Sequence, residues 1–97
     1  MVTVKVPGTV YRECFDPAAT QYPAEAGLPQ PTRQKVGKGS RYTYTVTEDQ
    51  ARDMLAHAYD FGVGLSYGVD DTAIGRSVTR WAVTEATRRG LTEGVLI

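Results

Sequence analysis

The stretch "RYTYTVTEDQARDMLAHA", Arg41 to Ala58, carries the signals for a strand and for a helix with no gap between them. Its first half alternates between two faces, with Tyr42, Tyr44 and Val46 on one face and polar residues on the other. This two-residue period is typical of a half-buried strand, and nearly all the residue types favour one. The sequence therefore predicts a strand over residues 41–46.

A helix is predicted to begin directly after this strand. Thr47 and Gln50 form a capping box, in which each side chain accepts a hydrogen bond from the other residue's backbone N–H. Two carboxylates in the first turn suit the positive end of the helix dipole. Apolar residues then recur at helical spacing, at Ala51, Met54, Leu55 and Ala58. We expect a helix over residues 48–61 that ends at Gly62.

A second helix is predicted over residues 71–89, capped by Asp70 or Asp71 and stopped by Gly90. Its interior contains Gly75, and a glycine there costs about 1 kcal/mol relative to alanine. This cost predicts that another backbone approaches the helix closely at that point. Between the helices lie Gly62, Gly64 and Gly68, which we expect to adopt positive φ so that the chain can reverse.

The N-terminal residues predict further strands. "VTVKV" alternates over residues 2–6, and "TVYREC" can continue as a strand over 9–13 after the Pro7–Gly8 break. We therefore expect an α+β fold, a small sheet of two or three strands packed against an α-helical hairpin. A chain of 97 residues predicts a single domain, 1–97. The predicted core consists of Val4, Val6, Val10, Tyr42, Tyr44, Val46, Met54, Leu55, Ile74, Val78 and Trp81.

Residues 16–39 form a Pro/Gly-rich arm that contains four of the five prolines. Irregular segments of this length inside a compact domain are usually either functional or disordered. Its end overlaps "TRQKVGKGSR", Thr32 to Arg41, which has four cations and no carboxylate. Such a stretch can meet an acidic protein surface or phosphate. We expect the arm to bind a protein partner through Tyr22, Leu28, Arg33, Lys35 and Lys38.

Composition narrows the class of protein. The net charge is zero, but residues 1–46 have six cations against three carboxylates, and residues 47–97 have five against eight. The bias toward Arg, Ala, Val, Thr and Gly is similar to that of high-GC bacteria and their phages. A short neutral chain of this kind resembles the accessory proteins that phages encode. The single Cys14 and the absence of a long apolar run predict a soluble cytoplasmic protein without membrane association.

Two short motifs suggest chemistry but lack the context it needs. "GLSYG" places Ser66 in a G-x-S-x-G pattern, yet a helix precedes it and the one histidine, His57, comes before the serine. "VGKGS" departs from a phosphate loop because Gly39 follows Lys38. One cysteine and one histidine cannot form a Cys/His zinc site. The sequence predicts no catalytic residue, no metal site and no cofactor.

One arrangement indicates a different function. A polar-faced strand followed by two helices resembles the ribbon–helix–helix family of DNA-binding proteins, over residues 41–90. That resemblance implies a dimer in which the strands of two subunits pair, and Arg41, Thr43 and Thr45 read bases in the major groove. The cations Arg33, Lys35 and Lys38 would add sequence-independent affinity. The segment between the helices is longer than the family's tight turn.

We therefore expect a non-enzymatic protein-interaction or regulatory module, phage-encoded and acting on a host protein. The alternative is a ribbon–helix–helix-like homodimer that binds nucleic acid. Salt-dependent binding of duplex DNA by a dimer would favour the alternative.

Overall fold

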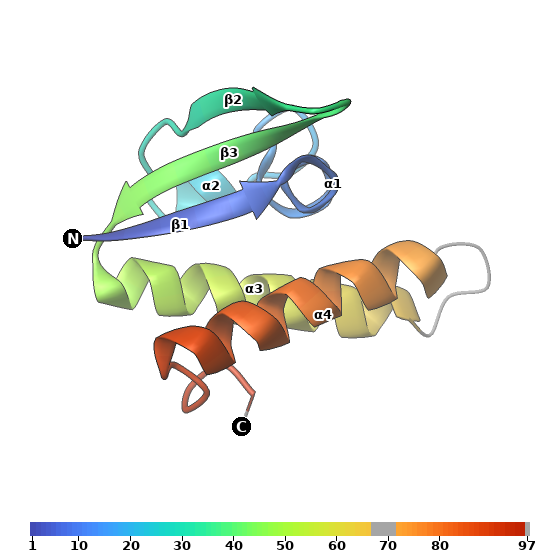
Figure 1. Ribbon diagram of the computed structural model, residues 1–97. Helices are drawn as coiled ribbons and strands as arrows, with labels where there is room; N and C mark the ends of the chain where they lie inside the picture. Colours follow the sequence, from blue (N-terminus) through green and yellow to red (C-terminus); the bar gives the residue numbers. More distant parts are fainter. Residues whose placement is uncertain (67–71, 97) are drawn as a thin grey trace. The chain divides into compact units, whose positions relative to one another are not determined.

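A computed structural model describes residues 1–66 and 72–96 of the chain. It shows an α+β fold with a three-stranded antiparallel sheet and a helical hairpin, which confirms the predicted fold class (Figure 1). The chain divides into two compact units, Met1–Ala51 with the sheet and Arg52–Ile97 with most of the helical pair. No helix in the described residues combines the length and the apolar composition that a membrane span requires.

The sheet contains β1 (Val2–Pro7), β2 (Thr32–Val36) and β3 (Gly39–Val46) in the order β1-β3-β2. Both pairs are antiparallel, with Val4 opposite Tyr44 and Arg33 opposite Tyr42. The strands predicted over 2–6 and 41–46 are therefore confirmed. The central strand is β3, which pairs with β1 on one edge and with β2 on the other.

The alternation that predicted β1 and β3 is visible in their burial. Val4, Val6, Tyr44 and Val46 are buried, whereas the residues between them point the other way and are more exposed. Directly opposed residues of an antiparallel pair share a face of the sheet. The valines of β1 and the aromatic residues of β3 therefore build one apolar face together.

The strand predicted over residues 9–13 is wrong. Gly8–Val10 form a short helix, α1, and Tyr11–Phe15 continue as a π-helical turn, η1. Val10, Cys14 and Phe15 are buried, at spacings of four and five residues that bring them to one side of a wide helical turn. A strand would instead have placed Arg12 on the same face as Val10 and Cys14. The helical turn leaves Arg12 exposed.

The arm over residues 16–39 is more ordered than its composition suggests. It contains a short helix, α2 (Tyr22–Glu25), and the third strand of the sheet, β2. The Gln50 side chain donates from Nε2 to the Gly27 carbonyl oxygen at 3.4 Å, which ties the arm to the start of the first long helix. The third strand is thus β2 rather than 9–13.

A tight turn joins β2 to β3. Val36 pairs with Gly39, so Gly37 and Lys38 alone make the connection. Gly37 has a φ of 59°, and no residue other than glycine has a positive φ among the residues described. Positive φ at the first central residue alone identifies a type II′ turn, whose twist matches that of the strands it joins.

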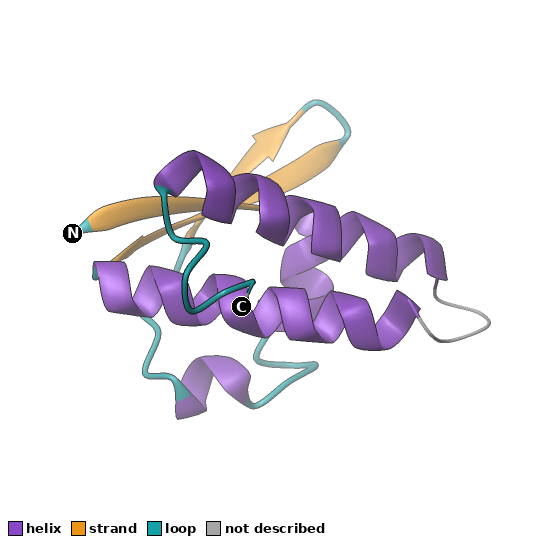
Figure 2. Cartoon of the chain, turned by 90° about the horizontal axis from the view of Figure 1, so that it is seen from below, coloured by secondary structure: helices purple, strands orange, loops and turns teal. Residues whose placement is uncertain are grey.

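Two long helices, α3 (Glu48–Ser66) and α4 (Thr72–Arg89), lie side by side and antiparallel (Figure 2). The capping box of α3 is confirmed: the Gln50 backbone N–H donates to Thr47 Oγ1 at 3.1 Å, and the Thr47 N–H donates to Gln50 Oε1 at 2.9 Å. Gly90 follows the C-terminal end of α4 with a φ of 68°, as a C-terminal capping glycine does.

The expectation that α3 ends at Gly62 is wrong. The helix continues through Gly62 and Gly64 to Ser66, and neither glycine has positive φ. A Cβ on Gly62 would lie 2.9 Å from the Gly75 carbonyl oxygen and 2.7 Å from the Thr79 backbone nitrogen. The close approach predicted at Gly75 is therefore present, and Gly62 makes it. Gly68, Asp70 and Asp71 lie outside the described residues.

Most of the predicted core is buried, but Tyr42, Ile74 and Trp81 are only partly buried. The core also contains four residues that the predicted core list did not include: Cys14, Phe15, Leu91 and Val95. Ala51, Ala58, Ala82 and Ala86 are fully buried along the two long helices. Small side chains of this kind allow helices to pack closely, consistent with the contact at Gly62.

Candidate functional site

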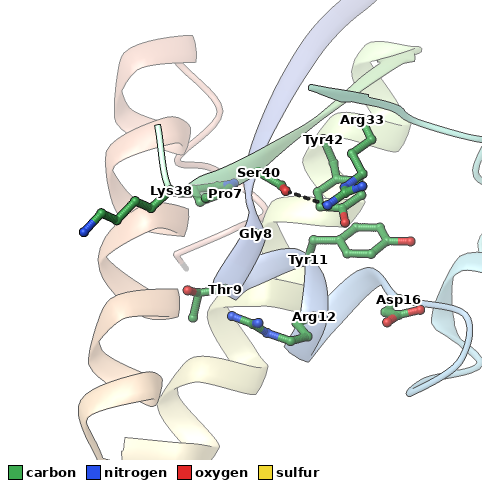
Figure 3. A pocket seen from close by; sticks show the side chains of 11 residues that line it. Pro7, Gly8, Thr9, Tyr11, Arg12, Asp16, Arg33, Lys38, Ser40 and Tyr42 are labelled. Carbon is green, nitrogen blue, oxygen red and sulfur yellow. Dashed lines mark hydrogen bonds between the residues drawn. The ribbon is translucent and has the colours of Figure 1, made fainter. Parts of the chain in front are cut away.

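A polar pocket of about 590 Å³ lies beside the β2–β3 turn, within the first unit. Figure 3 shows side chains from the hairpin on one side of it and side chains from α1 and η1 on the other. The residues that line it are Pro7, Gly8, Thr9, Tyr11, Arg12, Asp16, Arg33, Lys38, Gly39, Ser40 and Tyr42. Its volume is in the range of small-ligand sites.

Positive charge dominates this pocket. Three cations, Arg12, Arg33 and Lys38, line it against one carboxylate, Asp16. Arg33 donates from Nη2 to Ser40 Oγ at 3.2 Å, which holds its guanidinium near the sheet (Figure 3). Asp16 Oδ1 accepts from the Ala18 N–H at 3.0 Å, a local turn contact. The pocket is therefore suited to anionic groups.

Two stacked tyrosines form one wall of the pocket. The rings of Tyr11 and Tyr42 lie parallel within 6°, with centroids 3.6 Å apart. Burial raises the pKa of Tyr11, and the charge of Asp16 and the neighbouring Tyr42 raise it further. The Tyr11 phenol consequently stays protonated at neutral pH and can donate a hydrogen bond. Gly8 allows the adjoining close approach, because a Cβ there would lie 3.2 Å from the Ser40 carbonyl oxygen.

The residues predicted to bind a protein partner do not all lie together. Arg33 and Lys38 line the pocket, and Lys35 is exposed on the same strand face as Arg33. Tyr22 is half-buried, with its ring tilted against Phe15 at 5.9 Å. Leu28 is also half-buried and lines a small groove beside Phe15. The three cations are thus presented outward, whereas the two apolar residues pack toward the rest of the first unit.

The residues of the DNA-binding alternative divide between two faces of the sheet. Arg41 lies opposite Gln34, and Thr43 opposite Thr32, so these side chains share a face that excludes Arg33 and Lys35. Moreover, β3 pairs with β1 and β2 at once over residues 41–43. Pairing of β3 with a second copy, as the ribbon–helix–helix resemblance implies, would require one of these strands to leave.

The sequence did not identify the pocket residues that come from α1 and η1. The sequence pattern predicts a strand for Thr9, Tyr11 and Arg12, in which Tyr11 and Arg12 would point to opposite faces. The Pro7–Gly8 break was the signal for the change in direction. What the sequence could not show was that η1 would bring Tyr11 against Tyr42, since that contact joins residues far apart in the chain.

No group of three or more metal-ligating side chains occurs among residues 1–66 and 72–96. His57 is partly buried on α3, with its ring 6.3 Å from that of Phe61. Ser66 is the last residue of α3, whereas a nucleophile elbow would hold it on a strand-to-helix turn.

Cys14 is a buried residue of η1, and burial, with a smaller effect of Glu13, raises the pKa of its thiol to about 12. We expect the thiol of the native protein to resist labelling by a thiol reagent at neutral pH, because the reactive thiolate is scarce and covered. Comparing labelling rates with and without denaturant measures this protection. Rapid labelling of the native protein would contradict it.

The raised pKa of the Cys14 thiol also predicts that the stability of the protein changes at alkaline pH. Between the ordinary pKa of 9.0 and about 12, the unfolded chain loses the Cys14 proton while the folded chain keeps it. The free energy of unfolding should therefore be unaffected by this thiol below pH 9.0 and fall above it. Denaturation of Cys14→Ala over the same pH range is the control, since the variant lacks this part of the decline.

Comparison with known proteins identifies no matching family model, no similar curated protein and no similar solved structure.

Proposed function

We propose that the protein is a non-enzymatic binding module that holds a protein partner at its basic hairpin, the segment Thr32–Val46 that comprises β2, the Gly37–Lys38 turn and β3. One observation carries the proposal. All five residues of β2 are exposed, and the hairpin carries Arg33, Lys35, Lys38 and Arg41 with no carboxylate.

The position of β2 in the sheet supports this proposal. An edge strand presents backbone N–H and C=O groups that can pair with another chain. Cations on an edge oppose association with a neutral or basic strand, but they attract an acidic one. The positive charge of β2 therefore favours acidic partner strands, in addition to opposing aggregation through the strand edge.

The pocket adds a second binding feature to the surface of the basic hairpin. Arg33 and Lys38 belong both to the basic hairpin and to the pocket lining, and Arg12 extends the positive charge away from the sheet. A partner seated along the hairpin can place an acidic side chain in the pocket. Charge-assisted hydrogen bonds to arginine are about twice as strong as neutral ones.

A random-peptide display library tests this proposal. The immobilised protein should enrich a family of peptides that a variant carrying Arg33→Ala, Lys35→Ala and Lys38→Ala does not retain. All three side chains are exposed, so the variant should keep its stability within about 0.5 kcal/mol. A short DNA duplex, titrated at several salt concentrations, should bind no more tightly to the protein than to the variant.

Two results would overturn the proposal. One is the failure of any peptide family to distinguish the protein from the triple variant. The other is duplex DNA that binds the protein more tightly than the enriched peptides do and releases it steeply with salt, which would favour the nucleic-acid alternative.

A further inference from the structure

The outer edge of β2 is not paired with any strand in the described part of the chain. In the order β1-β3-β2, the strand β2 has β3 on one side only. The edge is short, because Pro31 has no N–H to donate and Gly37 begins the turn. It can therefore accept one short extended segment, about the length of β2 itself.

The register determines which backbone groups point outward from this edge. In a hairpin closed by two residues, the flanking pair exchanges hydrogen bonds, and every second pair after it does the same. Here these pairs are Val36 with Gly39, Gln34 with Arg41 and Thr32 with Thr43. The N–H and C=O groups of Arg33 and Lys35 consequently point away from β3, toward the outer edge.

The same two residues carry the charges of the strand. Arg33 and Lys35 lie opposite Tyr42 and Ser40, on one face of the sheet. The other face of β2 presents Thr32, Gln34 and Val36, and Val36 is 43% exposed. An added strand would therefore meet two cations on one face and an apolar side chain on the other.

From these observations we propose that β2 binds an extended acidic segment of another protein by strand addition. The segment carries Asp or Glu at two positions separated by one residue, so that both carboxylates face Arg33 and Lys35. Directly opposed side chains have Cβ atoms about 4.5–5.5 Å apart, which is within reach of an ion pair. The inference rests on the proposed function and specifies the chemistry of its partner.

Charge also argues against a second copy of this chain at the same edge. In antiparallel pairing of two β2 strands, the cations of one copy would oppose those of the other, and like charges directly opposite are destabilising. The charge of β2 thus favours an acidic partner strand over self-association.

The test uses a synthetic peptide in which Glu alternates with Val and Thr. A control peptide of the same composition has its Glu residues adjacent, so that in a strand they point to opposite faces. By isothermal calorimetry we expect the alternating peptide to bind more tightly than the control. On binding, the Arg33 and Lys35 amide protons should become protected from hydrogen exchange, whereas the ladder-bonded Gln34 amide should change little.

Two substitutions at Lys35 distinguish the contribution of its charge to binding from the contribution of its backbone N–H. Lys35→Ala removes one charge and should weaken binding by about two- to fivefold. Lys35→Pro also removes the outward N–H without touching the β2–β3 ladder, and should weaken binding by about a further three- to tenfold. Gln34→Ala is the matched control, since its side chain lies on the other face. Thermal denaturation verifies that each variant is folded, and hydrogen exchange on the unmodified protein tests the proposal even where Lys35→Pro unfolds.

Equal binding of the two peptides, or unprotected Arg33 and Lys35 amides in the bound state, would overturn strand addition. The proposed function would still stand if library peptides that distinguish the triple variant bind without protecting these amides. If no library peptide distinguishes that variant, the proposed function fails as well.

Discussion

Replacing Gly62 with alanine is expected to destabilise the protein by about 3 kcal/mol, in the upper part of the range for overpacked sites. The new methyl group would lie 2.7 Å from the Thr79 backbone nitrogen and 2.9 Å from the Gly75 carbonyl oxygen, and would also meet Thr79 Oγ1. Real Cβ atoms essentially never lie this close to other atoms. Two of the three atoms belong to the α4 backbone, so the two helices would have to move apart.

The Thr79 side chain has little freedom to relieve this contact. Its hydroxyl donates to the Gly75 carbonyl oxygen at 2.8 Å, so turning it away would break that bond. Chemical denaturation monitored by circular dichroism measures the effect. Gly64→Ala is the matched control, because that glycine lies in the same helix with nothing within 4 Å of its Cβ position.

Helix propensity alone should make Gly64→Ala stabilising by up to about 1 kcal/mol. The two alanine variants are therefore expected to shift stability in opposite directions. A Gly62→Ala variant as stable as the Gly64→Ala variant would contradict the close approach of α3 and α4 at this position.

Replacing Phe15 with alanine is expected to cost about 3–5 kcal/mol. Phe15 is completely buried at the end of η1, with the rings of Tyr22 and Tyr44 at 5.9 Å and 6.0 Å. Removing its ring leaves a cavity. It also removes the ring contacts to Tyr22 in the arm and to Tyr44 in β3. Small domains have a total stability of about 5–15 kcal/mol, so this variant should be near the limit of folding.

Phe15→Leu is the control for this prediction, since it keeps an apolar side chain and most of the volume. We expect its cost to stay below about 1.5 kcal/mol. Denaturant titrations of both variants provide the comparison. A loss of less than about 1 kcal/mol in Phe15→Ala would mean that the aromatic contacts contribute little, contrary to the burial of the ring.

Some elements were predictable because several independent signals agreed. In β3 and α3, alternation, residue preference and the capping box of Thr47 and Gln50 all indicated the same structure. The α4 boundaries followed from helical spacing and from Gly90. Such local signals do not depend on distant parts of the chain, so a sequence alone can reveal them.

Other elements depended on contacts that local patterns do not encode. All five residues of β2 are exposed, so the strand lacks hydrophobic alternation. Its sequence signal was the pair Gly37–Lys38 between two extended stretches, which suits a type II′ turn. The role of Gly62 is not predictable from the sequence, because a glycine that ends a helix and a glycine that allows helix packing look alike there. The packing role is recognisable only in the structure, where Gly62 lies against Gly75 and Thr79 of α4.

The candidate site was predictable only in part, because some of its residues have a local sequence signal and others depend on the fold. The density of cations pointed to Arg33 and Lys38, which line the pocket. The contributions of Tyr11 and Arg12 depended on the π-helical turn η1, which returns to the sheet. A pocket assembled from separated segments needs the fold before its members can be recognised.

The stacked rings of Tyr11 and Tyr42 and the chain's single tryptophan, Trp81, give the two units different optical probes. The tyrosine stack contributes to the near-ultraviolet circular dichroism from the first unit, to which Trp81 also adds, whereas tryptophan fluorescence reports on the second unit alone. If the chain unfolds as one cooperative domain, both signals should change at the same denaturant concentration. If the units unfold separately, two midpoints should be observed, and a peptide bound at the basic hairpin should raise only the first.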